Sequence, residues 1–464
     1  MRAVRHLVGG TMVTAAIVVM APQVVAQQEG ADADSVSQSL QARVDELDQQ
    51  VRVLQRLREL AADSVTAAAK DKISPTASGK DGFSIKSADG KYAVRLKGLV
   101  QADGRFFLSD SAFPVTNNFF IRRARPILEA TVGKYLEFRV QPDFAQGTTV
   151  LFDAYTDVKV SPAFAVRVGK FKPPVGLERL QSAGDIVFAE RALATNLVPN
   201  RDVGLQLSGD IDSGSVAWQA GVFNGVPDLG NGDGDVSDAK DFAVRVFLQP
   251  FKQGTLSGLG VGISGSTGLE RGTTAAPALA SYRTPGQQTW FRYATSTTTP
   301  TTNVFADGRR TRIVPQAYFF TGPLGLQGEY VQSSQEVKRL DVEALKLTHT
   351  AWQATGSYFL TGEKNSWKAV SPKKSFDPKA GTFGAVELAA RYSELSMDDA
   401  TFPAFANPAS TPTKAKAWAV GLNWYLAKAI KLMVDYEHTT FSGGTAAGDR
   451  EAESFVVTRV QHSF

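Results

Sequence analysis

From residue 92 to the end of the chain, apolar and polar residues alternate with a period of two. The alternation runs in stretches of roughly 8–14 residues, broken by Gly, Pro, Asn and Asp, which is typical of β-strands joined by turns. Because side chains alternate between the two faces of a strand, each stretch has one apolar and one polar face. We predict sixteen strands, at residues 92–107, 118–132, 135–145, 149–160, 164–171, 203–210, 215–224, 241–249, 258–268, 309–320, 325–336, 347–360, 383–395, 414–427, 430–441 and 451–464.

The connections between these strands alternate in length. Tight turns at 133–134, 322–323 and 427–428 are separated by longer pieces such as 225–240 and 269–308. Short turns on one side and long loops on the other are typical of transmembrane β-barrels, whose strand number is even. A soluble sandwich would give the same local alternation, but strands of roughly 10–14 residues suit a tilted membrane crossing. The sequence therefore predicts an all-β transmembrane barrel of sixteen antiparallel strands at residues 83–464, in the bacterial outer membrane.

A different period precedes the barrel. Apolar residues recur at spacings of four and three, and Arg58 interrupts the seam formed by Leu40, Val44, Leu47, Val51, Leu54 and Ala61. This heptad pattern predicts a coiled-coil helix at residues 27–62, in the periplasm. It is short for a coil that must form alone in water, and a single amphipathic helix lying on its own domain is the alternative. Residues 63–82, rich in Ala, Ser, Lys and Asp, are expected to be a linker.

The two ends of the chain carry export signals. Arg2 and Arg5, an apolar stretch from Leu7 to Met20 and a small-residue site ending at Ala26 predict a secretory signal peptide at residues 1–26. An uncleaved anchor helix is the alternative. The last strand ends at Phe464 and resembles the C-terminal signal of bacterial outer-membrane barrels, so we expect the barrel-assembly machinery to be a partner.

Charge matters here by position rather than in total. The chain has no cysteine and a formal net charge of +4, which falls to +2 when Arg2 and Arg5 leave with the signal peptide (4 − 2). If lipid covers the apolar faces, the polar faces line a lumen, and sixteen strands leave an aqueous channel. Rings of Arg and Lys are one way to build an anion pore. The alternation predicts that the lumen is lined by Lys97, Arg105, Arg123, Arg125 and Arg139.

One loop is expected to narrow this lumen. "GKFKPPVGLERLQSAGDIVFAERALATNLVPNRDVG", residues 169–204, holds about thirty residues without a period between two strands. It can project outside, or fold inward and pack its apolar residues, such as Leu177 and Phe188, inside the barrel. We favour the inward fold. It would bring five further basic side chains to the channel: Lys170, Lys172, Arg179, Arg191 and Arg201.

Several segments together resemble one known family. "RVGKFKPPVGLERLQSAGDIVFAERALATNLVPNRDVGLQLSG", "FFIRRARPILEATVGKYLEFRVQPDF", "GVFNGVPD", "GTFGAVELAARYSELSMDD" and "AVGLNWYLAKAIKLMVDYEHTTF" are similar to the phosphate-selective porin O/P family and span nearly all of residues 83–464. The resemblance implies a homotrimeric outer-membrane porin that passes phosphate or other small anions passively. The trimer would supply the partners that the heptad segment needs. "FIRRARP" matches the family's double-arginine motif, although alternation turns Arg122 away from the lumen unless a bulge re-aims it.

Three alternatives stay open within and beside this family. The channel could be a general or organic-anion porin, could prefer pyrophosphate, or could be a non-conducting structural barrel. One long connection, residues 361–384, falls on the short-turn side and is locally basic. It could fold into the channel exit or remain a solvated turn, and its lysines are Lys364, Lys368, Lys373, Lys374 and Lys379.

Other classes of function find little support in the sequence. The acidic stretch "NGDGDVSD" lacks the helices and the Glu of a calcium-binding hand. The four histidines have no metal-ligand spacing. No nucleophile elbow, phosphate loop or dinucleotide fingerprint occurs in a strand-to-helix context. We therefore expect no enzyme activity, no cofactor, no metal and no nucleic-acid partner.

Overall fold

The structure is a computed structural model, which describes residues 32–70, 74–78, 82–108, 115–235, 237–368 and 370–464. The expected signal peptide, residues 1–26, lies outside the described residues. The chain divides into two compact units, residues 1–70 and 71–464, and each is described by itself. None of the described helices is long and apolar enough to cross a membrane.

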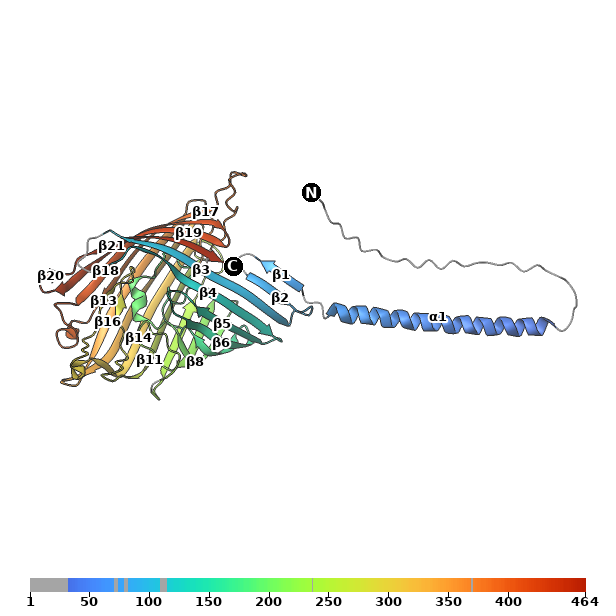
Figure 1. Ribbon diagram of the computed structural model, residues 1–464, viewed down its shortest axis with the longest axis horizontal. Helices are drawn as coiled ribbons and strands as arrows, with labels where there is room; N and C mark the ends of the chain where they lie inside the picture. Colours follow the sequence, from blue (N-terminus) through green and yellow to red (C-terminus); the bar gives the residue numbers. More distant parts are fainter. Residues whose placement is uncertain (1–31, 71–73, 79–81, 109–114, 236, 369) are drawn as a thin grey trace. The chain divides into compact units, whose positions relative to one another are not determined.

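Sixteen antiparallel strands form a closed barrel in the second unit (Figure 1). The barrel closes where the last strand pairs with the first, for example at Val460 and Ala102. Each strand overlaps one of the sixteen expected from the sequence, so the predicted fold class is confirmed. In chain order they are β3 (Tyr92–Phe107), β4 (Asn118–Val132), β5 (Leu136–Asp143), β6 (Val150–Ser161), β7 (Phe164–Phe171), β8 (Asp202–Ile211), β9 (Val216–Phe223), β10 (Asp241–Leu248), β11 (Leu259–Arg271), β14 (Phe305–Thr321), β15 (Leu324–Arg339), β16 (Val342–Phe359), β17 (Ala385–Ser396), β18 (Pro412–Ala427), β19 (Ile430–Thr445) and β21 (Glu453–Ser463).

The burial of side chains is inverted relative to a soluble protein. On β10 the apolar side chains of Phe242 and Val244 are 60% and 53% exposed. On β3 the polar side chains of Gln101 and Asp103 are almost fully buried, whereas Leu96 and Val100 are exposed. A soluble sandwich would bury the apolar face instead. The apolar outer face therefore suits hydrocarbon, and the polar face lines the interior.

The two ends of the barrel differ in their connections. We call the end that carries the β4–β5, β6–β7 and β14–β15 turns the turn end, and the opposite end the loop end. At the loop end one connection is much shorter than expected, and at the turn end the structure has the long connection that the sequence predicted. At the loop end, β15 and β16 are joined by only two residues, Leu340 and Asp341, and at the turn end β16 and β17 are separated by residues 360–384.

The segment before the barrel corrects the expected linker. Helix α1 (Asp32–Lys70) continues past residue 62, because the stretch up to residue 70 is rich in alanine, the best helix former. Strand β1 (Ser74–Ser78) then pairs with β2 (Gly82–Lys86), and β2 pairs with β3 at Ala93–Leu96. The heptad side chains Leu40, Val44, Leu47, Val51 and Leu54 are all exposed along α1.

Apolar packing fills part of the barrel interior. Buried side chains of residues 172–201, which include the 3-10 helix η1 (Leu193–Leu197), meet those of a second inward segment, residues 272–304. This second segment carries the hairpin of β12 (Tyr282–Arg283) and β13 (Thr289–Phe291), followed by η2 (Pro300–Thr302). Both segments pack against apolar inward side chains of the β14–β18 wall, such as Val331 and Leu395. The remaining short elements are η3 (Asp399–Thr401) and β20 (Gly448–Asp449), which pairs with the end of β19.

Candidate functional site

Residues 172–201 cross the inside of the barrel, as we expected from their apolar content. Apart from η1 the segment has no regular structure, so its buried backbone groups need side-chain partners. Glu329 of β15 accepts the N–H groups of Leu177 and Glu178 at 2.6 and 3.1 Å, and Asp435 of β19 accepts the N–H of Ala189 at 2.7 Å. Acidic side chains on two separate strands of the wall therefore hold the segment, which we call the constriction loop.

The carbonyl groups of the same loop are held by basic and amide side chains. Carbonyl oxygens at residues 186, 187, 189 and 190 accept hydrogen bonds from the wall. The donors are Lys431 at 3.0 Å, Asn423 at 2.9 Å, Arg459 at 2.6 Å and Arg391 at 2.8 Å, respectively. This stretch of the loop is thus fixed to β17, β18, β19 and β21 through its backbone.

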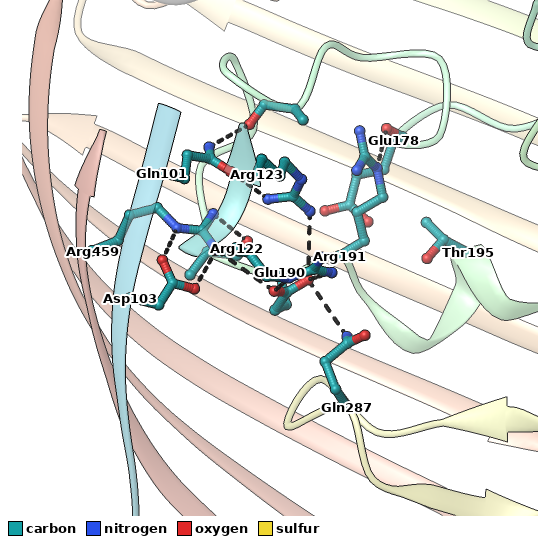
Figure 2. A network of polar contacts seen from close by, with 12 residues as sticks. Gln101, Asp103, Arg122, Arg123, Glu178, Glu190, Arg191, Thr195, Gln287 and Arg459 are labelled. Atoms are coloured by element: carbon teal, nitrogen blue, oxygen red, sulfur yellow. Dashed lines mark hydrogen bonds and ion pairs between the residues drawn. The ribbon is translucent and has the colours of Figure 1, made fainter. Parts of the chain in front are cut away.

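Glu190 lies at the centre of a group of arginines (Figure 2). Arg122 donates to both of its carboxylate oxygens, at 2.5 and 3.1 Å. Three more guanidinium groups lie within ion-pair distance: Arg105 at 3.6 Å, Arg123 at 3.6 Å and Arg459 at 3.5 Å. Burial alone would raise the pKa of Glu190, but Arg122 and Arg123 hold that pKa below its ordinary value. The carboxylate therefore stays ionised while it links the loop to β3, β4 and β21.

A β-bulge explains how neighbouring arginines both reach Glu190. On β4, Arg123 pairs with Gln101 and Ile121 pairs with Ala102, so Arg122 is an extra residue without a partner in the register. Such a bulge re-aims the side chain of the extra residue. Of these two neighbours, alternation placed only Arg123 inside. A register shift between two strands cannot be seen in the alternating pattern of one strand.

Two cavities flank the constriction loop, and both are basic. The turn-end cavity, of about 480 Å³, is lined by seven basic side chains, Lys97, Arg125, Arg139, Arg167, Lys172, Arg201 and Arg245, and by two acidic ones, Asp153 and Asp185. The loop-end cavity, of about 420 Å³, is lined by five basic side chains, Arg122, Arg123, Arg179, Arg191 and Arg283, and by the acidic Glu190 and Asp228. A third space of about 530 Å³ contains Arg105 and Arg283.

Nine of the ten basic residues predicted for the lumen thus line one of these spaces. The exception is Lys170, whose buried ammonium group pairs with Asp233. Alternation also applies to β7 and β10, where Arg167 and Arg245 stand between outward valines, so the sequence analysis could have found both. Arg283 comes from the second inward segment and carries no such signal.

Two chemical groups stand out among the basic side chains that line the cavities. In the first group, carboxylates fix the guanidinium: Arg125 with Asp143 at 2.7 Å, Arg139 with Glu129 at 2.8 Å, Arg201 with Asp153 at 3.2 Å and Arg167 with Asp157 at 2.7 Å. The second group consists of Lys172, Arg179 and Arg191 on the constriction loop. They donate to carbonyl oxygens at 2.8, 2.8 and 2.7 Å, and none forms an ion pair with a described carboxylate.

The second group concentrates positive charges without ion-pair partners among the described residues at the constriction. Burial first, and then the charges of Arg201 and Arg191, lower the pKa of Lys172 well below its usual value. Burial and the neighbouring Arg191 lower the pKa of Arg179 to about 9. Like charges crowded in this way favour a bound anion, which would relieve both the burial and the repulsion.

The five lysines of the long turn do not join this group. All five are exposed, and none lines the turn-end or loop-end cavity. Trp367 of the same turn lines the turn-end cavity. Phe376 and Phe383 pack against Trp424, with ring centroids 5.3 and 5.8 Å apart. One part of the turn, at Trp367, therefore faces the lumen, and another part, at Phe376 and Phe383, packs on the outer face. The five lysines of the turn are exposed to solvent.

The described part of the chain contains no candidate metal-binding site. No three His, Asp or Glu side chains there gather closely enough to hold a metal ion. Most carboxylates of the interior instead pair with arginines or accept backbone N–H groups, as Asp143 and Glu329 do.

Comparisons with known proteins agree with this architecture. The sequence profile of the family described as phosphate-selective porin O and P matches residues 94–464. The chain is 25% identical over 424 residues to Porin O of Pseudomonas aeruginosa, covering 87% of this chain and 95% of that protein. Two solved structures share the fold with a TM-score of 0.52 each. They are the outer membrane channel DcaP of Acinetobacter baumannii (11% identity, covering 82% of this chain and 99% of that one) and an anion-selective porin from Comamonas acidovorans (13%, covering 80% and 100%).

Proposed function

The chain belongs to the phosphate-selective porin O and P family of the bacterial outer membrane, and from this premise we propose that it is an anion-selective channel whose leading substrate is inorganic phosphate. Diffusion through the channel is passive. The single observation that carries the proposal is the excess of basic side chains along both cavities, seven to two and five to two.

An anion that enters a narrow, low-dielectric passage loses hydration, and positive side chains must replace it. Lys172, Arg179 and Arg191 can do so because they donate to carbonyl oxygens and none of them forms an ion pair with a described carboxylate. They lie on the loop that contributes to both cavities, and we propose them as the central anion-binding groups. The arginines with carboxylate partners form a track of weaker anion-binding sites on each side of the constriction. An anion binds to these sites weakly enough to leave.

Guanidinium geometry favours phosphate among small anions. A guanidinium offers a planar fork of donors that matches two oxygens of a phosphate, whereas an ammonium group acts as a point charge. Carboxylate partners hold the arginine forks of Arg125, Arg139 and Arg201 in fixed orientations. A general or organic-anion porin, or one that prefers pyrophosphate, would use the same track, and these are the alternatives within the proposal.

We further propose that the working unit is a homotrimer with α1 in the periplasm. The exposed heptad side chains of α1 support this, because they need partner helices to bury them. The closing strand β21, which pairs with β3, would present Phe464 to the barrel-assembly machinery during insertion.

Planar-bilayer recording of the purified protein tests the proposal. In a KCl gradient we expect a reversal potential of the sign that shows chloride preference. Phosphate added at low concentration should then block the chloride current, and it should do so at lower concentration than an organic anion such as gluconate. A cation-selective reversal potential would contradict anion selectivity. Stronger block by pyrophosphate or gluconate than by phosphate would favour the alternative substrates, and a silent barrel would favour a structural role.

A further inference from the structure

We propose that the four arginines around Glu190 form a latent oxyanion-binding site, in which the Glu190 carboxylate is a built-in ligand that competes with the permeating anion. The ligand class is a small oxyanion such as phosphate or sulfate. The inference deepens the proposed anion channel and rests on it, because it concerns how tightly the permeating anion is held at the constriction.

The geometry around Glu190 is that of an occupied anion site. Arg122 donates two hydrogen bonds to the carboxylate, and Arg123 and Arg459 approach it from other directions (Figure 2). Arg105 lies at 3.6 Å from the same carboxylate. Gln287 adds an amide donor at 3.4 Å. Four guanidiniums face two carboxylates, Glu190 and Asp103, so the cluster keeps an excess of two positive charges (4 − 2). One carboxylate therefore does not exhaust the capacity of this site.

One of the arginines, Arg105, is incompletely satisfied, although it is buried. The Nε and Nη2 atoms of Arg105 have no hydrogen-bond partner among the described residues, and Nη2 is the atom that faces Glu190 at 3.6 Å. Arg123 donates to Gln101 and lies 3.6 Å from Glu190 without a hydrogen bond to it. Buried donors without partners are costly. A tetrahedral oxyanion offers more oxygens than a carboxylate and could reach these donors as well.

The site is open to the channel, and the loop does not depend on the carboxylate alone. Glu190 lines the loop-end cavity together with Arg122 and Arg123. The backbone carbonyl of Glu190 is held separately by Arg391, and the neighbouring Ala189 is held by Arg459 and Asp435. Neutralising the side chain therefore removes the built-in ligand while these backbone contacts stay in place.

A tethered carboxylate has a consequence for transport. Because it is part of the chain, it always competes at high effective concentration for the same donors. A pore must hold its ion weakly enough to release it. We infer that Glu190 weakens the constriction's affinity for anions and so speeds their release.

The test compares E190Q with the matched variant E137Q in planar bilayers. Glu137 lies at the turn end, where it pairs with exposed Lys159, so E137Q removes the same charge outside the arginine cluster. The measured quantity is the phosphate concentration that halves the chloride current. For E190Q we expect a value about tenfold lower than wild type, corresponding to one charge-assisted hydrogen bond gained by the anion. For E137Q we expect a value within about twofold of wild type.

The double variant E190Q/R122Q distinguishes the proposed change in anion affinity from a general loss of loop structure. It removes the carboxylate and its main partner together, which restores the local charge balance, so its phosphate block should return toward wild type. An unchanged half-blocking concentration in E190Q, or an equal change in E137Q, would overturn the inference even if the wild-type channel selects anions. If E190Q does not fold, equal block by the double variant and wild type supports the inference, and tighter block by the double variant overturns it. Loss of anion selectivity in the wild type would instead refute the proposed function.

Discussion

At the scale of single residues, the partners of a basic side chain decide its role more than its charge does. Arg125 and Arg201 have carboxylates at 2.7 and 3.2 Å, which neutralise and orient them. Among the described residues, Lys172 donates to two carbonyl oxygens, at 2.8 and 3.3 Å, and to no carboxylate. A lysine in this position offers an uncompensated charge to a passing anion, and its protonation can be measured through the current.

The pH dependence of anion block should report on Lys172. Burial, together with the charges of Arg201 and Arg191, lowers the pKa of Lys172 below the ordinary lysine value of 10.5. Below its lowered pKa the side chain is charged and helps to bind anions, and as pH rises through that pKa the charge is lost. We therefore expect block of the chloride current by sulfate to weaken as the pH rises. The midpoint of this loss should lie below pH 10.5, because the pKa of Lys172 is lowered. Sulfate is the better probe because phosphate itself titrates near neutral pH.

Two arginine substitutions separate this effect from other titrating groups. In K172R the guanidinium at position 172 keeps its proton to higher pH than the lysine does. The weakening of sulfate block should therefore shift to higher pH, to the range where Arg179, with its pKa of about 9, loses its proton. In K379R, on the exposed turn, the wild-type pH dependence should remain. A K172R channel that keeps the wild-type profile would show that another group is responsible.

Sequence reasoning found the strand-borne part of this site because it depends on a local rule. Alternation alone puts Lys97, Arg125 and Arg139 on the inner face, and all three line the turn-end cavity. Alternation did not predict the inward direction of Arg122, because that direction depends on the pairing of β4 with β3, which the sequence of a single strand does not show. Lys170 departs from the alternation: it shares the register of the outward Val168 on β7, yet it is buried and pairs with Asp233, a partner in a distant loop.

At the scale of elements, the constriction depends on two inward segments rather than one. The strands were predictable because their pattern is repeated in each stretch of sequence. The hairpin of β12 and β13 was not, because Tyr282 and Phe291 acquire their apolar partners only after the barrel has brought the β14–β18 wall around them. In sequence, residues 269–308 read only as one of the long external connections.

The start of the constriction loop should depend on Glu329. This carboxylate accepts two buried N–H groups, those of Leu177 and Glu178. In E329A both donors lose their partner, at a cost of roughly 1–3 kcal/mol each. We expect the loop to loosen, so that single-channel chloride conductance rises, current noise increases and phosphate block weakens.

The matched variant for this test is E394A. Glu394 lies on the outward-facing register of β17 and pairs with Lys414 at 3.0 Å. Its removal costs a surface ion pair but no contact of the loop, so conductance and phosphate block should match wild type. Equal conductance and equal block in E329A and E394A would show that Glu329 does not hold the loop.

At the scale of the whole molecule, the apolar and basic groups divide the interior of the barrel between them. Apolar side chains of the two inward segments pack against β14–β18, whereas the basic side chains that line the turn-end cavity lie on β3–β10 and on the constriction loop. This division explains how a wide barrel becomes a narrow passage: one part of the lumen is filled by a packed core, and the part left open is charged.

The helix α1 tests the assembly proposed for the whole molecule. Valines alternate with leucines along its seam, at Val44 and Val51 and at Leu40, Leu47 and Leu54. Valine at one core position with leucine at the other favours two-stranded coils, so a three-stranded coil here would be imposed by the trimeric barrel. The chain contains no cysteine, so a single introduced thiol can pair only with its copy in another subunit.

In L47C, cysteines from neighbouring helices would face one another across the coil, within the short Cβ separation that a disulfide needs. Mild oxidation of the full-length protein should give a covalent dimer on a non-reducing gel, with the third subunit left uncoupled. Q49C places the thiol on the opposite face of the same helix and should stay monomeric. Equal cross-linking of the two variants, or none in L47C, would mean that α1 does not join its copies along this seam, and the exposed leucines would then need another partner.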